Sequence, residues 1–208
     1  MPGDVPVTVK IRLGFEDTAT FADVVSGIAD AGADELTIHA RTKRQGYRPP
    51  AHWEHIREAN DLIDLPINAN GEIWSVEDAR RCRAVSGSDR LMLGRGALCR
   101  PDLPALIAMS DRGEPATPLG WSDIPPLLNR FFALNLASYD ARHAGNPLKQ
   151  WLVYLRSYYP QAHGLFEQVK RLHDPAAIQR ELDAETARVS AGGSPTGPAR
   201  MGKRRQAA

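Results

Sequence analysis

The sequence has only two cysteines and no apolar run long enough to cross a membrane. A membrane span needs roughly 18 consecutive apolar residues, and the opening Met-Pro-Gly-Asp-Val-Pro is unlike a signal peptide. Cys82 and Cys99 lack the spacing of a metal site, and we interpret both as structural thiols rather than as a disulfide framework. The sequence therefore predicts a cytoplasmic protein that binds neither a membrane nor a metal.

Acidic residues are scarce only in the last third of the chain. Residues 141–208 hold 11 Lys and Arg against 5 Asp and Glu, whereas residues 1–140 hold 15 against 20. A basic surface can bind a polyanion by neutralising its phosphates and releasing counterions. A solvated surface with a basic tail has the same composition, so charge alone leaves both interpretations open.

The first half of the chain alternates between two patterns. Short β-branched runs at residues 5–13, 35–39, 65–70 and 90–94 predict four strands. Helical spacing between them predicts helices over residues 21–31, 52–59 and 76–85, with Ser75 as the N-cap of the third. Regular strand–helix alternation is typical of parallel β/α units.

After residue 98 no strand pattern remains. A segment rich in proline and glycine leads into four predicted helices, over residues 124–139, 147–158, 164–172 and 175–189. We therefore expect a helical domain over residues 113–189. The composition of residues 190–208 cannot form a buried core and predicts a disordered basic tail.

Polar residues and glycines follow each predicted strand. They are Lys10 and Arg12, His39 and Arg41, Asn70, Gly71 and Glu72, then Gly94, Arg95 and Gly96. The carboxyl ends of parallel strands line the ligand site in β/α folds, and the last two strands of a (β/α)8 barrel often bind phosphate. Glycine lets the backbone approach an anion, and arginine offers a forked donor. Each residue alone has an ordinary structural explanation, but together they favour an anion site.

Six segments, taken in order, resemble tRNA-dihydrouridine synthases. Four of them resemble strands five to eight of that family's barrel: Val9-Lys-Ile-Arg-Leu-Gly14, His39-Ala-Arg-Thr-Lys-Arg-Gln-Gly-Tyr47, Asn68-Ala-Asn-Gly-Glu-Ile73 and Met92-Leu-Gly-Arg-Gly-Ala97. Residues 148–156 and 165–172 are similar to the helical domain of the bacterial C branch, which is associated with tRNA position 16. The resemblance covers roughly residues 5–180.

This resemblance implies the C-terminal half of a (β/α)8 TIM barrel, in residues 1–112, followed by an all-helical domain that binds tRNA. It also implies that FMN, reduced by NADPH, reduces uridine to dihydrouridine in the tRNA D-loop. The implied FMN contacts are Lys10, His39, Asn70, Gly71, Glu72, Gly94 and Arg95. Lys10 and His39 would face the flavin ring, and the others would hold its phosphate.

The resemblance and the spacing of the helix at residues 147–158 together suggest the tRNA contacts. They are Tyr47, Arg41, Lys149, Trp151, Arg156 and Arg171. The alternative is an ordinary core helix with Trp151 and Tyr154 packed inward and the charges at its rim.

The family's first four strands and its Asn-Cys-x-x-Pro loop, which bears the catalytic cysteine, have no counterpart here, and neither Cys82 nor Cys99 has the context of that cysteine. We therefore expect a chain that needs a missing N-terminal half barrel, in cis or in trans, and that is inactive alone. A non-enzymatic RNA-binding remnant and an unrelated phosphate-binding barrel lyase or isomerase are the rival hypotheses.

Overall fold

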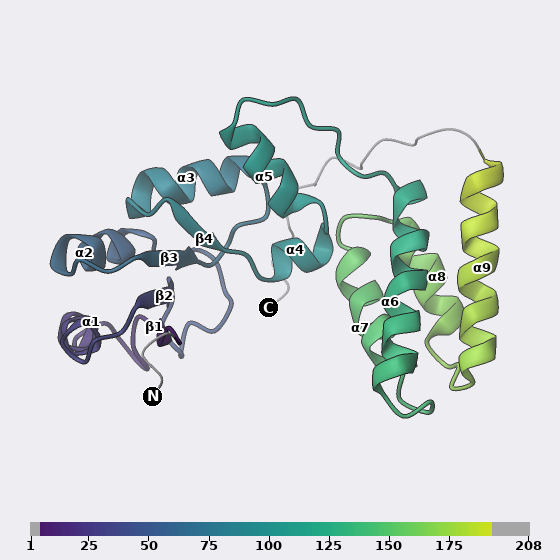
Figure 1. Cartoon of the computed structure of the whole chain (residues 1–208), viewed down its shortest axis with the longest axis horizontal. Coiled ribbons are helices and arrows are strands. Elements are labelled where there is room, and N and C mark those ends of the chain that lie inside the picture. Colours follow the sequence, from purple (N-terminus) through teal and green to yellow (C-terminus); the bar gives the residue numbers. More distant parts are fainter. Residues whose placement is uncertain (1–4, 193–208) are drawn as a thin grey trace. The chain divides into compact units, whose positions relative to one another are not determined.

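A computed structural model describes residues 5–192, which form two compact units. The first unit extends to Ala97 and also includes Leu103–Gly113; the second consists of Leu98–Asp102 and the chain from Glu114 onward. Figure 1 shows the sheet with its helices in the first unit and a group of helices in the second. Each unit is described separately.

The first unit is a parallel four-stranded sheet in the order β1-β2-β3-β4. Its strands are β1 (Thr8–Arg12), β2 (Glu35–His39), β3 (Ile67–Asn70) and β4 (Arg90–Met92). The connecting helices are α1 (Phe21–Asp30), α2 (Glu54–Leu62) and α3 (Val76–Ser86), and α4 (Arg95–Cys99) and α5 (Leu103–Asp111) follow. The predicted β/α alternation is confirmed, whereas α4 and α5 were not predicted because proline and glycine at their ends mask the helical pattern.

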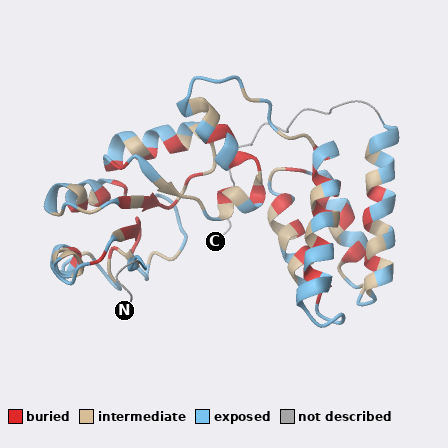
Figure 2. Ribbon diagram, viewed as in Figure 1, coloured by how far each residue is buried: buried red, intermediate tan, exposed pale blue. Residues whose placement is uncertain are grey.

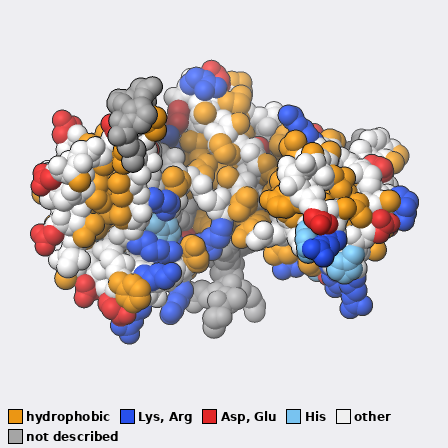
Figure 3. Space-filling view, turned by 60° about the horizontal axis from the view of Figure 1, so that its bottom comes forward, with side chains coloured by type: hydrophobic (Ala, Val, Ile, Leu, Met, Phe, Trp, Pro, Cys, Tyr) orange, Lys and Arg blue, Asp and Glu red, His pale blue; other side chains and the backbone are white. Residues whose placement is uncertain are grey.

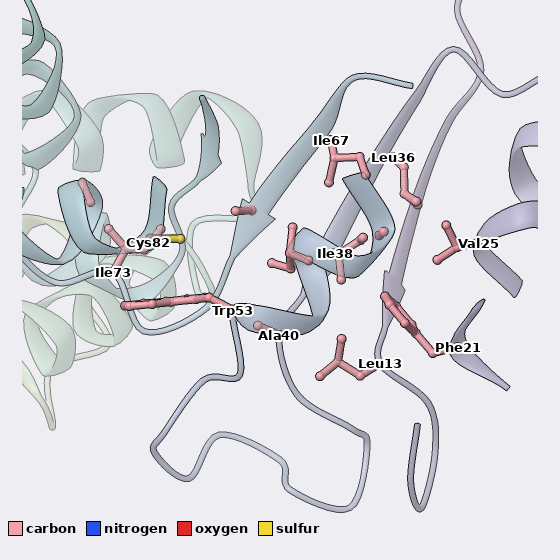
Figure 4. Close-up of a cluster of buried hydrophobic side chains, with 14 of the residues drawn as sticks. Leu13, Phe21, Val25, Leu36, Ile38, Ala40, Trp53, Ile67, Ile73 and Cys82 are labelled. Carbon is pink, nitrogen blue, oxygen red and sulfur yellow. The ribbon is translucent and has the colours of Figure 1, made fainter. Parts of the chain in front are cut away.

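One face of the sheet is apolar and packs against the helices. Leu36 and Ile38 of β2 lie in register with Ile67 and Ala69 of β3, and all four are buried. Figure 4 shows this core with side chains from strands and helices, including Val25 of α1 and Cys82 of α3. Burial raises the pKa of Cys82 to about 12, which suits a structural thiol.

The opposite face of the sheet is polar. One row of neighbours in register is Lys10, Thr37, Asn68 and Arg90, and the next is Arg12, His39, Asn70 and Met92. Cross-strand bonds connect this face: Asn68 Nδ2 donates to Thr37 Oγ1 at 3.2 Å, and Arg90 pairs with Glu35 at 2.9 Å. The predicted site residues Lys10, His39 and Asn70, together with Arg12, thus lie on the face opposite the hydrophobic core.

Helix α3 begins where the sequence predicted. The Ser75 hydroxyl accepts the backbone N–H of Asp78 at 3.0 Å, and the helix ends at Gly87, whose φ of 72° suits glycine. The three-residue offset between hydroxyl and amide is local, so the sequence alone specified this cap.

The second unit is a helical bundle. Short η1 (Trp121–Asp123) precedes α6 (Ile124–Ser138), α7 (Gly145–Leu155), α8 (Gln161–Val169) and α9 (Pro175–Ala191). Helix α6 packs on α7 and α9, and α8 packs on the same two helices. Figure 2 shows buried residues as stripes along these helices. The bundle buries one continuous core around Leu128, Leu148 and Leu182.

Two boundaries differ from the sequence-based ones. Helix α9 continues to Ala191, so the first residues of the segment predicted to be disordered are helical; residues 193–208 lie outside the described residues. Leu98–Asp102 belongs to the second unit, inside the range assigned to the barrel. Long-range contacts cause this: Trp151 Nε1 donates to the Leu98 carbonyl at 3.0 Å, and Asp102 accepts from the Leu119 amide at 3.0 Å.

No helix within residues 5–192 combines the length and apolar character that a membrane crossing requires. The same residues contain no group of three or more His, Cys, Asp or Glu side chains that could hold a metal ion.

Candidate anion site at the carboxyl ends of the strands

The predicted site residues of the first unit meet at the carboxyl ends of the four strands. Lys10 Nζ donates to Asn70 Oδ1 at 3.3 Å, and Asn70 Nδ2 donates to the Met92 carbonyl at 2.7 Å. A chain of two bonds therefore orients the Lys10 ammonium from across the sheet. Figure 3 shows Lys and Arg side chains grouped around a histidine on this unit.

His39 is buried at the end of β2, with 7% of its surface exposed. Burial first, and then the positive charges of Arg12, Arg41, Lys10 and Arg95, lower its pKa to about 4. The imidazole is therefore neutral at pH 7. Its Nδ1 is buried without a hydrogen-bond partner among the described residues, so its hydrogen-bonding capacity is unsatisfied in this structure.

The electrostatics of this site favour an anion. The four cations that act on His39 come from the ends of β1 and β2 and from the start of α4. Burial, followed by repulsion from Arg12, lowers the pKa of Lys10. A negative group at the site would relieve this repulsion.

Arg95 lies over two aromatic rings. Its guanidinium carbon is 4.5 Å from the centroid of the Tyr47 ring and 5.1 Å from that of the Trp74 ring. Arg12 contacts the same tyrosine at 5.3 Å and donates to the carbonyls of Thr42 and Gly46. Stacking leaves the edge of a guanidinium free to donate, which is the edge that binds a phosphate in a forked geometry.

Backbone geometry at two glycines matters here. Gly71 has a φ of 119°, which favours glycine, and a Cβ there would lie 3.6 Å from the His39 ring. At Gly96 a Cβ would lie 2.1 Å from the Ile73 carbonyl oxygen, which is too close for any side chain. At Gly94 the space around a Cβ is open, so packing within the described residues does not require glycine there.

Two predicted residues have other contacts than expected. Arg41 was expected at the substrate surface, but it is fully buried, pairs with Glu72 and donates from Nε to the Arg48 and Pro50 carbonyls. Glu72 was expected to hold phosphate, but its carboxylate accepts from Arg41 and from Trp74 Nε1. Trp74 was not among the predicted site residues; its indole bonds to Glu72 only two residues away, but its contact with Arg95 depends on the fold.

The residues predicted to contact tRNA in the second unit differ in exposure. Arg156 and Arg171 are exposed, and Arg156 lies over the Phe166 ring at 5.4 Å. Lys149 Nζ instead donates to the Leu172 carbonyl at 2.6 Å. Trp151 is half-buried and packs edge-on against Phe131 at 5.0 Å. The environment of Trp151 thus agrees better with a core helix that packs Trp151 inward than with a ring exposed for stacking on RNA.

A family model described as "Dihydrouridine synthase (Dus)" matches residues 3–185. The chain belongs to the dihydrouridine synthase family. It is similar to "tRNA-dihydrouridine(16) synthase" of Pseudomonas putida, with 44% identity over 185 residues, which are 89% of this chain and 57% of that protein. The protein of the same name from Pseudomonas syringae pv. tomato is 44% identical over 186 residues, covering 89% and 59%.

The protein of that name from Shewanella oneidensis is 40% identical over 183 residues, covering 88% of this chain and 56% of the relative. The chain therefore spans somewhat more than half the length of these curated relatives. The family match covers most of each unit, and the residues of the candidate anion site all lie within it.

Proposed function

We propose that this chain is the C-terminal part of a tRNA-dihydrouridine synthase that reduces uridine to dihydrouridine in the tRNA D-loop. In this proposal residues 1–112 are strands five to eight of a (β/α)8 barrel, and residues 113–189 bind tRNA. The observation that carries it is the cationic site at the carboxyl ends of four parallel strands, in a chain of this family. The cytoplasm, where tRNA is modified, is the proposed location.

The residues of the anion site fit FMN. The unpartnered Nδ1 of His39 can bond to a polar edge of the flavin, and Lys10 supplies a cation beside it. The Gly71 and Glu72 backbone, Gly94 and Arg95 would hold the phosphate. Because the Glu72 carboxylate is already committed to Arg41 and Trp74, only its main chain suits a phosphate.

FMN bound here would supply the redox chemistry, accepting hydride from NADPH and passing hydride to the uracil C5=C6 bond. The role of the residues of this chain would be to bind the cofactor and orient it. Asn70 orients the Lys10 ammonium, which would stabilise negative charge on a bound flavin. Neutral His39 would help to position the flavin ring without adding a further charge.

Tyr47, Arg156 and Arg171 are the proposed tRNA contacts that remain exposed. Tyr47, at 61% exposure beside the anion site, suits stacking on an unstacked base. Lys149 and Trp151 would contact tRNA only at the cost of their present bonds to the Leu172 and Leu98 carbonyls.

The acid that protonates uracil would come from a segment outside this chain. Cys82 is buried in the core between the sheet and the helices, and its raised pKa disfavours the reactive thiolate at neutral pH. Cys99 is buried as well. We therefore propose that the preceding half barrel, in cis or in trans, completes the protein, and that this chain alone does not reduce tRNA.

The test is co-expression of this chain with the N-terminal half of a full-length relative, followed by flavin spectroscopy and a uridine reduction assay with NADPH. We expect co-purification, a yellow complex and turnover, and background turnover for the chain alone. A chain that binds tRNA but never FMN, with or without the added half, would instead support the RNA-binding remnant. A chain that binds neither FMN nor tRNA, with or without the added half, would refute the proposal.

A further inference from the structure

Glu72 has a backbone conformation that its residue type disfavours. Within residues 5–192 it is the one residue other than glycine with a positive φ, at 57°. A side chain is costly to keep in this region, and such outliers concentrate where the surrounding structure uses the residue. The side chain of Glu72 therefore needs a structural account.

The two oxygens of the Glu72 carboxylate have different partners. Oε2 pairs with the Nη2 of fully buried Arg41, and Oε1 accepts from Trp74 Nε1 at 3.0 Å. One carboxylate thus joins a buried cation to an indole ring.

Each of these partners holds one side of the anion site. Arg41 Nε donates to the Arg48 carbonyl at 2.6 Å and to the Pro50 carbonyl at 3.2 Å, which holds the end of the loop at residues 42–50. Trp74 supports Arg95 at 5.1 Å, and Arg95 in turn contacts Tyr47 of the same loop at 4.5 Å. The contacts therefore form a closed circuit through Glu72, Arg41, the loop, Arg95 and Trp74.

We propose that Glu72 is a positioning residue that couples this loop to Arg95, so that an anion bound by Arg95 also holds the loop. The coupling to a ligand rests on the proposed function, whereas the positioning of the loop does not. An anion that immobilises Arg95 also restrains Tyr47 and Trp74, which pack against its guanidinium. Through its bonds to Trp74 and Arg41, Glu72 extends this restraint to residues 48–50 at the other end of the loop.

Trypsin can report on the loop because Lys43 and Arg44 lie in it and are exposed. Cleavage after either residue, located by mass spectrometry, would be timed in the chain and in Glu72→Gln and Trp74→Phe. Glu72→Gln removes the charge that pairs with Arg41; Trp74→Phe keeps an aromatic face for Arg95 but loses the bond to Glu72. Glu16→Gln is the matched control, since Glu16 pairs with Arg44 of the same loop at an exposed position.

Without ligand, we expect cleavage in the loop to become at least about tenfold faster in Glu72→Gln and severalfold faster in Trp74→Phe, and to stay within about twofold in Glu16→Gln, because exposed pairs contribute little. Circular dichroism would verify that each variant is folded. Unchanged loop cleavage in both folded test variants would refute the positioning role, whatever the chain binds.

FMN is the probe for the coupling, added to the chain completed by the N-terminal half of a relative. We expect protection of the loop in the parent and at most half of that protection in Trp74→Phe at matched FMN saturation. Equal protection in both would refute the coupling. If the completed parent binds no FMN, the proposed function fails, and the ligand-free comparison still decides whether Glu72 positions the loop.

Discussion

Removing Arg95 should weaken anion binding at the strand ends by a predictable amount. A hydrogen bond to a charged group contributes about 1.5–3 kcal/mol, which corresponds to roughly 10- to 150-fold in affinity. The loss of the contacts with Tyr47 and Trp74 adds a separate effect on the ligand-free protein, about 0.5–1 kcal/mol for each exposed cation–π pair. Arg95→Ala should therefore lower both FMN affinity and the free energy of unfolding.

The assay is quenching of flavin fluorescence during titration, with urea unfolding measured in parallel, on the chain completed by the N-terminal half of a relative. Arg95→Lys should recover part of the affinity because it keeps the charge but loses the planar fork. Arg90→Ala is the matched control, because it removes an equal charge from the opposite end of β4, where Arg90 pairs with Glu35. Equal affinities of Arg95→Ala and its parent, or an equal loss in Arg90→Ala, would refute the assignment of Arg95 to the phosphate.

Three further predictions concern pH, packing and RNA. Burial and the neighbouring cations hold the pKa of His39 at about 4 in the folded protein, below its ordinary value of 6.5. The unfolded chain therefore binds one more proton between pH 6.5 and pH 4. The stability that neutral His39 contributes, at most about 3 kcal/mol, should be complete above pH 6.5 and lost as pH falls to 4, so urea unfolding of His39→Gln should show a shallower loss over that range. Gly96→Ala should destabilise the first unit by about 1–3 kcal/mol in urea unfolding, since its Cβ would overlap the Ile73 carbonyl, and a neutral result would contradict this geometry. In the completed protein, Arg156→Glu should flatten the salt dependence of tRNA binding by about one unit of slope. Lys149→Glu should mainly lower the free energy of unfolding. An unchanged tRNA affinity and salt slope in the variant that carries both substitutions would exclude this face of α7 as the tRNA-binding surface.

The sequence alone determined those features that depend on neighbouring residues. Alternation of β-branched runs with helical spacing specified the four strands and three helices between them, because burial of one face imposes a fixed period on each element. The three-residue offset between the Ser75 hydroxyl and the Asp78 amide specified the start of α3. Parallel connectivity then required the polar residues after each strand to meet at one edge, so Lys10, His39 and Asn70 could be grouped without a structure.

The tertiary structure decided how each of those side chains is used. Arg41 and Glu72 follow neighbouring strands, as ligand-binding residues often do. They nevertheless pair with each other, because the fold brings them together across a separation of 31 residues. Lys149 and Trp151 lie on a helix with suitable spacing for RNA, but the Leu172 and Leu98 carbonyls take their donors. Local patterns fix which residues are polar and where they lie along an element; the choice between binding a ligand and bonding within the protein depends on partners far away in the sequence, which only folding brings within reach.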